Sequence, residues 1–211
     1  METIYRRGIS WPDLETLQAE LKARALADAS QAFLLVSEPT PTFTHGISGK
    51  PSALLWANPA EKGVAVYPAD RGGQWTYHGP GQIVAYPIAH LETLGYARRG
   101  VRPYLHALAS SVTRFVQNQG IQAEVRDCPF GVYGPSGKLA SFGISVRQGI
   151  ASHGVSVYLK PQGDYFQGIV ACGAAEITSS SLEQEGVSLD WDTAAHALSD
   201  YIKRGFEGSK K

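Results

Sequence analysis

The stretch from Arg71 to Gln82 constrains the fold most, because it reads RGGQWTYHGPGQ and lies between two apolar runs. These runs, GVAVYPAD (63–70) and QIVAYPI (82–88), are rich in β-branched and aromatic residues and predict strands. Glycine permits positive φ and close backbone approach, and proline fixes one turn geometry. We therefore expect a loop between two sheet elements that presents bare glycine amides to a ligand.

A decorated hairpin would explain the glycines of this stretch, and it is the usual role of such a loop. It does not require a cation, a phenol and an imidazole so close together, yet the stretch carries Arg71, Tyr77 and His78. The spacing matches neither the dinucleotide pattern G-x-G-x-x-G nor the G-K-[ST] ending of a phosphate-binding loop. Phosphate binding by those routes is therefore not expected.

The remaining patterns alternate helices with blocks of strands. Helical spacing of apolar residues predicts helices over 10–29, 102–120 and 192–206, the first with a Ser10 cap. Short β-rich runs predict strands over 32–38, 121–126, 130–134, 138–147 and 151–159. This order predicts an α+β fold with a mixed, mostly antiparallel sheet flanked by helices, and the absence of repeats or linkers predicts one domain over 1–211.

Composition narrows the functional classes. Lys+Arg and Asp+Glu are balanced at 19 each, so no overall field favours nucleic acid or an anionic membrane. The two cysteines, Cys128 and Cys172, are too few for a disulfide framework, and no apolar run is long enough for a signal core or a membrane span. The histidines and cysteines show no metal-ligand spacing. We expect a cytoplasmic protein without a metal.

At this point the sequence resembles a known family, the lipoyl(octanoyl) transferases. The long motif RGGQWTYHGPGQIVAYPI carries the likeness, together with PTFTHG (41–46), Gly137-Lys138, SFG (141–143), HG (153–154) and ACG (171–173), over roughly 32–183. The resemblance implies the fold shared by biotin and lipoate ligases. It also implies transfer of an octanoyl group from acyl carrier protein to a lysine of lipoyl domains, without a cofactor. The expected acceptors are lipoyl domains of 2-oxoacid dehydrogenases and the glycine cleavage H protein.

The resemblance assigns Cys172 as the nucleophile that carries the acyl thioester, and Lys138 as the cation that favours its thiolate and relays protons. From the residues alone, a lone cysteine is usually a small buried apolar residue, and a lysine beside a turn is usually solvated. The resemblance also places a substrate pocket at Arg71, Gly72, Gly73, Gln74, Trp75, Thr76, Tyr77, His78, Ser141, Phe142, Gly143, His153, Gly154, Val155 and Ser156. Within this set, the amides near Gly143 and Gly154 are expected to bind the oxyanion.

Several points remain open on sequence grounds. His78 and His153 are candidates for catalytic bases or for structural hydrogen bonding. Cys128 precedes Pro129 and is expected to be structural. Ala171 replaces the proline of many relatives, and the bulky Trp75 leaves the preferred acyl length open.

Three other functions compete with octanoyl transfer. A lipoate or biotin ligase shares the fold but activates a free acid with ATP, and it needs no cysteine nucleophile. A non-catalytic protein would bind acyl carrier protein without turnover. A cysteine hydrolase would release free octanoate, because water would replace the acceptor amine.

Overall fold

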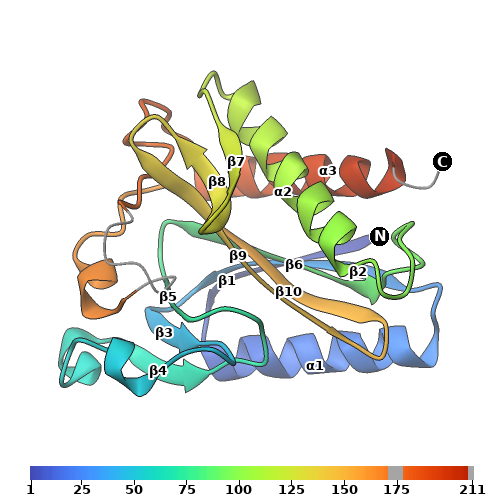
Figure 1. The fold of residues 1–211 in the computed structure, drawn as a ribbon, viewed down its shortest axis with the longest axis horizontal. Helices are drawn as coiled ribbons and strands as arrows, with labels where there is room; N and C mark the ends of the chain where they lie inside the picture. The colour runs from blue at the N-terminus through green and yellow to red at the C-terminus, as the bar shows by residue number, and fades with distance from the viewer. Residues whose placement is uncertain (171–177, 209–211) are drawn as a thin grey trace.

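The computed structural model of the chain describes residues 1–170 and 178–208. Its main sheet has seven strands in the order β1-β2-β6-β10-β9-β8-β7 (Figure 1). The strands are β1 (Glu2–Ile9), β2 (Ala32–Pro39), β6 (Gln82–His90), β7 (Glu124–Asp127), β8 (Phe130–Gly134), β9 (Gly137–Arg147) and β10 (Ile150–Tyr158). β1 pairs parallel with β2 and the other neighbours pair antiparallel. The prediction of a mixed, mostly antiparallel sheet is thus confirmed.

Helix α1 (Trp11–Ala27) covers one face of this sheet (Figure 1). As expected, Ser10 caps it: the Ser10 Oγ accepts from the Asp13 N–H, which satisfies a backbone donor of the first turn. Its buried side packs Leu14 and Leu21 against β2 and β6. Leu26, which the sequence pattern placed on the apolar side, is instead exposed.

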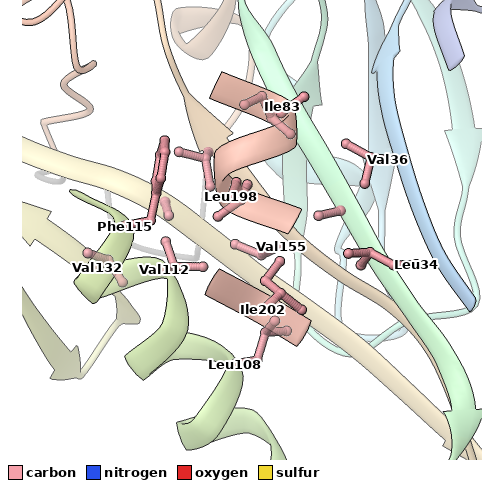
Figure 2. Packing of buried hydrophobic residues seen from close by; sticks show 14 of the residues in the cluster. Leu34, Val36, Ile83, Leu108, Val112, Phe115, Val132, Val155, Leu198 and Ile202 are labelled. Atoms are coloured by element: carbon pink, nitrogen blue, oxygen red, sulfur yellow. The ribbon is translucent and has the colours of Figure 1, made fainter. Parts of the chain in front are cut away.

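Helices α2 (Val101–Asn118) and α3 (Trp191–Glu207) cover the opposite face. Figure 2 shows Leu108 and Val112 of α2, together with Leu198 and Ile202 of α3, packed over the sheet residue Val155. All five side chains are at most 2% exposed, and burial of such branched side chains stabilises a fold by about 1.5–3 kcal/mol each. This is the larger of the two apolar layers on the main sheet.

A second sheet was not expected. It has the order β4-β3-β5 and contains β3 (Thr42–His45), β4 (Ala65–Pro68) and β5 (Trp75–His78). β5 lies inside the glycine-rich stretch, so the prediction of one continuous loop there is wrong. Trp75 and Tyr77 alternate along β5 and are both buried, and this pattern suits a strand paired with β3. Three short 3₁₀ helices complete the description: η1 (Pro51–Ala53), η2 (Pro59–Lys62) and η3 (Tyr165–Gly168).

The pairing of β8 with β9 contains a register shift that matters for the site. Val132 pairs with Ala140, but Tyr133 pairs with Lys138, so β9 has one extra residue at this point. As a result, Leu139 and Ala140 both belong to the apolar layer under α2 and α3. Because side chains alternate along a strand, the bulge places Lys138 and Ser141 together on the other face, although they are three positions apart.

None of the described helices is long and apolar enough to cross a membrane.

Candidate active site

A cavity of about 290 Å³ lies on the face of the main sheet that α1 partly covers, and this is near the lower end of the range for small-molecule pockets. It is lined by residues from the glycine-rich stretch, from four strands of the main sheet and from two turns: Ser48, Arg71, Gly73, Gln74, Trp75, Thr76, His78, Tyr86, Pro129, Phe130, Ser141, Phe142, Gly143, Gly154, Val155 and Ser156. Aromatic rings and serine hydroxyls share the wall. Most of the pocket residues that the sequence suggested therefore lie around one space.

The floor of the cavity is formed by small residues on β9 and β10. Ser141 pairs with Ser156 across the two strands, and Gly143 pairs with Gly154. The alternating residues Val155 and Val157 belong to the apolar core on the other face. Because glycine and serine project little volume above a sheet, these two cross-strand pairs leave room for a ligand.

Lys138 is buried, with 2% of its surface exposed, rather than solvated. Its side chain lies over Gly131, where an added Cβ would come within 2.3 Å of the Lys138 Cε and 3.1 Å of its Nζ. Gly131 itself pairs with Ser141 and follows Phe130, and both of those residues line the cavity. The aminomethyl end of Lys138 thus lies next to the β8–β9 end of the cavity.

The backbone of Lys138 is hydrogen-bonded to residues 178–180, where the described chain resumes after residue 170. The Lys138 N–H donates to the Thr178 carbonyl, and the Ser180 N–H donates to the Lys138 carbonyl, each at 2.9 Å. Cys172 and Ala171 lie outside the described residues. In sequence, the segment that carries them leads directly into Thr178, whose carbonyl oxygen accepts from the Lys138 N–H.

Arg71 organises the glycine-rich stretch through its guanidinium. This group is buried and donates to the carbonyl oxygens of Gly72, Gln74 and Thr44 and to the Thr44 hydroxyl, at 2.7–3.2 Å. These bonds tie the turn before β5 to β3. Arg71 also lines the cavity, so it contributes a fixed positive charge to that space.

The two histidines differ in position. His78 lines the cavity, whereas His153 is not among the described lining residues and faces α1. There the Gln18 Oε1 accepts from the His153 N–H, and the Gln18 amide lies 3.4 Å from the His153 Nε2. Burial first, and then the nearby Arg71 charge, lower the pKa of each histidine to about 3. Both rings are therefore neutral near pH 7, which makes them poor proton donors there.

Two other residues of the expected pocket lie behind its wall. Tyr77 is not among the described lining residues, and its ring stacks on Tyr165 at 4.4 Å between centroids. Burial raises the pKa of Tyr77 well above its ordinary value, so its hydroxyl stays protonated. Gly72 also lies outside the lining, and its N–H donates to the Ile144 carbonyl.

The expectation that the glycine amides of this stretch stay bare is accordingly wrong for two of them. The Gly72 N–H is bonded as described, and the Gly81 N–H donates to the Glu38 carboxylate at 3.0 Å. Buried backbone donors need partners, and these loops find them within the fold.

Sequence reasoning missed Ser48, Tyr86, Pro129 and Phe130 as lining residues. Tyr86 lies in the apolar run after the glycine-rich stretch. Because side chains alternate along a strand, Tyr86 faces away from the core residues Ile83 and Ala85, and this alternation could have indicated its position in the site. Pro129 and Phe130 follow Cys128 on a separate hairpin, and no motif connects them with the loop. Cys128 itself is exposed and unpaired. In residues 1–170 and 178–208, no group of three or more His, Cys, Asp or Glu side chains could hold a metal ion.

Buried hydrogen bonds fix the serines of the floor. The Ser156 hydroxyl donates to the Gln82 amide oxygen at 2.6 Å, and Gln82 in turn donates to Gln162 at 2.8 Å. The Tyr158 hydroxyl donates to the Ser141 Oγ at 2.7 Å. Because the Ser141 Oγ accepts from Tyr158, the Ser141 O–H can donate to a different group.

Comparison with known proteins gives these features a context. The family model of the lipoyl protein ligase A/B catalytic domain matches residues 15–204. A relative from Pyrobaculum arsenaticum, named a probable octanoyltransferase, is 36% identical over 86% of this chain and 81% of its own length. An octanoyltransferase from Chromobacterium violaceum is 33% identical over 95% of this chain and 92% of its own.

Among solved structures, lipoate-protein ligase A bound with ATP is similar with a TM-score of 0.73 and 12% identity, over 99% of this chain and 85% of that one. This similarity concerns the fold, and it confirms the expected ligase-like architecture. The long sequence matches go further, and they establish that the chain belongs to the lipoyl protein ligase A/B catalytic domain family.

Proposed function

We propose that this protein is an octanoyltransferase that moves an octanoyl group from octanoyl-acyl carrier protein to a lysine of lipoyl domains, the first step of protein lipoylation. Cys172 is the proposed nucleophile and Lys138 the proposed proton-transfer residue. The names of the long relatives support the reaction class. Lipoyl domains of 2-oxoacid dehydrogenases and the glycine cleavage H protein are the proposed acceptors.

One observation carries the proposal: a buried lysine lies beside one end of a cavity lined by aromatic rings and serine hydroxyls. Lys138 is 2% exposed, and its Cε lies over Gly131, which pairs with the lining residue Ser141. An amine held beside the cavity can give a proton to a leaving thiolate and accept one from an attacking amine, so its position suits proton transfer. An apolar space beside it suits an acyl chain.

In the proposed first step, the Cys172 thiolate attacks the carbonyl carbon of the pantetheine thioester. A new C–S bond forms, the old C–S bond breaks, and the pantetheine sulfur leaves as a thiolate that takes up a proton from Lys138. One thioester replaces another, so the step is nearly balanced and needs no ATP. Backbone amides near Gly143 and Gly154 are the proposed donors to the oxyanion, and the Ser141 hydroxyl, which accepts from Tyr158, is a further one.

In the second step, a neutral acceptor lysine attacks the acyl-Cys172 carbonyl. A C–N bond forms, the C–S bond breaks, and the Cys172 thiolate is regenerated. The extra proton on the attacking nitrogen passes to the Lys138 Nζ, which gave its own proton to the pantetheine thiolate in the first step. Because an amide is more stable than a thioester, this step makes the transfer directional.

The decisive experiment incubates the protein with octanoyl-acyl carrier protein in the absence of ATP and measures intact mass. We expect an octanoyl adduct in the wild type and in Cys128→Ser, and no adduct in Cys172→Ser. Addition of a lipoyl domain should then move the acyl group from the enzyme to the domain.

The alternatives give different results in the same assay. Strict ATP dependence with free octanoate as substrate would favour a ligase and would falsify the transfer reaction. Binding of acyl carrier protein with no adduct and no product would indicate a non-catalytic protein. Free octanoate as the main product in the presence of acceptor would indicate a hydrolase.

A further inference from the structure

Helix α1 carries an amide side chain in the stripe that it buries against the main sheet. Gln18 is 3% exposed and lies in this stripe between Leu14 and Leu21. A glutamine amide has two donor hydrogens and an acceptor oxygen, so its burial is unfavourable unless these groups are bonded. A leucine would suit the apolar pattern of the stripe, so the amide at this position needs a reason of its own.

The partner of Gln18 lies on β10. The Gln18 Oε1 accepts from the His153 N–H at 2.8 Å, across 135 positions of sequence. The Gln18 Nε2 lies 3.4 Å from the His153 Nε2 and donates to the Glu15 Oε1 at 3.3 Å. His153 is neutral near pH 7, so its Nε2 can accept from the amide. Both ends of the Gln18 amide therefore contact His153, one at the backbone and one at the ring.

His153 has an unusual place in the sheet. Its φ is +53°, in the left-handed region that residues other than glycine rarely occupy. The register of β10 with β6 stops at Ala151 and resumes at Val155. Continued through this gap, the register sets His153 opposite Pro87, which has no N–H to donate. At this point of β10 the His153 N–H donates out of the sheet to α1.

The conformation of His153 sets the direction of the next amide, that of Gly154. A left-handed residue has ψ near about +47° and an antiparallel strand has ψ near about +135°, so the following peptide is rotated by about 90°. Gly154 lines the cavity and pairs with Gly143. The backbones of β10 and β6 lie close together here, since an added Cβ at Gly154 would be 2.3 Å from the Ala85 carbonyl oxygen. The amide at this part of the cavity floor thus has an orientation that a regular strand would not give it.

We propose that Gln18 is a positioning residue: its hydrogen bond holds His153 in the left-handed conformation and thereby fixes the Gly154 amide for the acyl carbonyl. This inference rests on the proposed function, in which amides near Gly154 bind the oxyanion. Without the Gln18 acceptor, the His153 N–H would be buried and unpaired. Relaxation of His153 to an extended conformation would relieve its backbone strain and turn the Gly154 amide. Gln18 is not among the described residues that line the cavity, so it acts through β10.

The test replaces Gln18 with leucine, which removes the acceptor and suits the apolar stripe. Exchange of the His153 amide hydrogen with solvent should become about ten-fold faster, the size expected for one lost hydrogen bond. Turnover with octanoyl-acyl carrier protein and a lipoyl domain is measured in parallel. We expect kcat to fall about 10- to 100-fold with little change in KM, because an oxyanion donor acts mainly in the transition state.

Infrared spectroscopy of the acyl-enzyme reports on the carbonyl directly. The octanoyl group carries an isotope-labelled carbonyl, and a Cys128→Ser background confines the adduct to Cys172. Hydrogen bonds to a carbonyl oxygen lower its stretching frequency, so Gln18→Leu should raise the frequency of the acyl-enzyme above that of the same protein with Gln18. A protein that is only less stable would keep the original frequency.

Leu21→Ala is the matched control. Leu21 is 2% exposed and lies in the same stripe of α1, so its truncation should lower the urea midpoint of unfolding. It leaves the hydrogen bond between Gln18 and His153 in place, and the folded variant should keep the wild-type kcat and carbonyl frequency. Equal changes in Leu21→Ala would assign the effect to packing of α1 and would overturn the inference.

The outcomes separate this inference from the proposed function. Wild-type turnover and carbonyl frequency in folded Gln18→Leu would overturn the positioning role. A wild-type protein that forms no octanoyl adduct would instead reject the transferase reaction. In that case faster exchange of the His153 amide in Gln18→Leu would still support the hold of Gln18 on His153, and unchanged exchange would overturn it.

Discussion

The two faces of strands β9 and β10 have opposite compositions. One face carries Leu139, Ala140, Val155 and Val157 and belongs to the largest apolar cluster. The other face carries glycine and serine in cross-strand pairs and forms the floor of the cavity. The same two strands therefore supply both core packing and an open space, because side chains alternate between the faces of a sheet.

Residues that stabilise the fold and residues that line the cavity therefore lie next to each other along the same two strands. Lys138 and Leu139 are neighbours in sequence, yet the bulge in β9 turns one toward the cavity side and the other into the core. Substitutions on the cavity face should change acyl transfer more than folding, and substitutions on the core face should do the reverse. The following predictions test that separation.

The largest effect is expected for Lys138→Ala. Loss of a proton-transfer group in the proposed mechanism should lower the rate of acyl transfer by about 10²–10⁴-fold. Single-turnover transfer to a lipoyl domain measures the effect, and circular dichroism checks that the variant remains folded. Full activity in a folded Lys138→Ala protein would contradict the proposed role.

Leu139→Ala tests the neighbouring position on the core face. Leu139 has no exposed surface and packs in the cluster under α2 and α3, so truncation should reduce the free energy of unfolding by about 2–5 kcal/mol. Urea denaturation gives this value. At temperatures where the variant is folded, its transfer rate should stay within a few-fold of wild type, and a loss as large as that of Lys138→Ala would refute the separation.

Gly131→Ala tests whether the position of the Lys138 side chain matters. The new Cβ would meet the Lys138 Cε at 2.3 Å and the Ala140 carbonyl oxygen at 2.8 Å, so the lysine has to move. We expect transfer to fall about ten- to hundred-fold, since displacement of a catalytic group by about 1 Å can have an effect of that size.

Gly134→Ala on the same strand is the control for Gly131→Ala. Its nearest contacts would be the ends of the Leu139 and Glu185 side chains, which can move more easily than backbone. It should preserve most of the transfer activity. Equal losses in both variants would assign the effect to distortion of β8 rather than to Lys138.

The smallest effect concerns pH. The pKa of His153 is about 3 in the folded protein and 6.5 in an unfolded chain, so only the unfolded state binds a proton between these values. The stabilisation from a neutral His153 is therefore complete above pH 6.5 and declines as the pH falls toward 3, by about 1 kcal/mol per pH unit. His153→Asn should reduce this slope, because asparagine does not titrate and tolerates the positive φ of 53° at this position. Urea unfolding at pH 4.5, 5.5 and 6.5 compares the slopes, and identical slopes would contradict the prediction.

Local patterns in the sequence were sufficient for most of the elements. The apolar spacing behind Ser10 predicted α1, and the β-rich runs after α2 predicted the strands β7 to β10. The pattern failed at β5, because four glycines around it indicate a loop while the buried Trp75 and Tyr77 find their partners only on β3. It also failed at β1, whose polar residues pair in parallel with the distant strand β2.

The residues of the candidate site likewise include some that the sequence predicted and some that it did not. A distinctive motif indicated Arg71, His78 and the small residues of the floor, and the cavity does bring these together. Tyr86 lies in the same motif but was predicted only as part of a strand, and Phe130 carries no motif, so only the sheet order placed both beside the others.

The sequence by itself determined the fold class, the helices, the family and the residue types available for chemistry, because periodicity and motifs act over short distances along the chain. Tertiary structure decided which side of the sheet each of these residues faces. A single extra residue in β9 turns Lys138 toward the cavity, and the pairing of β6, β10 and β9 places Tyr86 on the same sheet face two strands away from β9. Both depend on hydrogen-bonded register between strands that are far apart in sequence, and no local pattern of residues encodes that register.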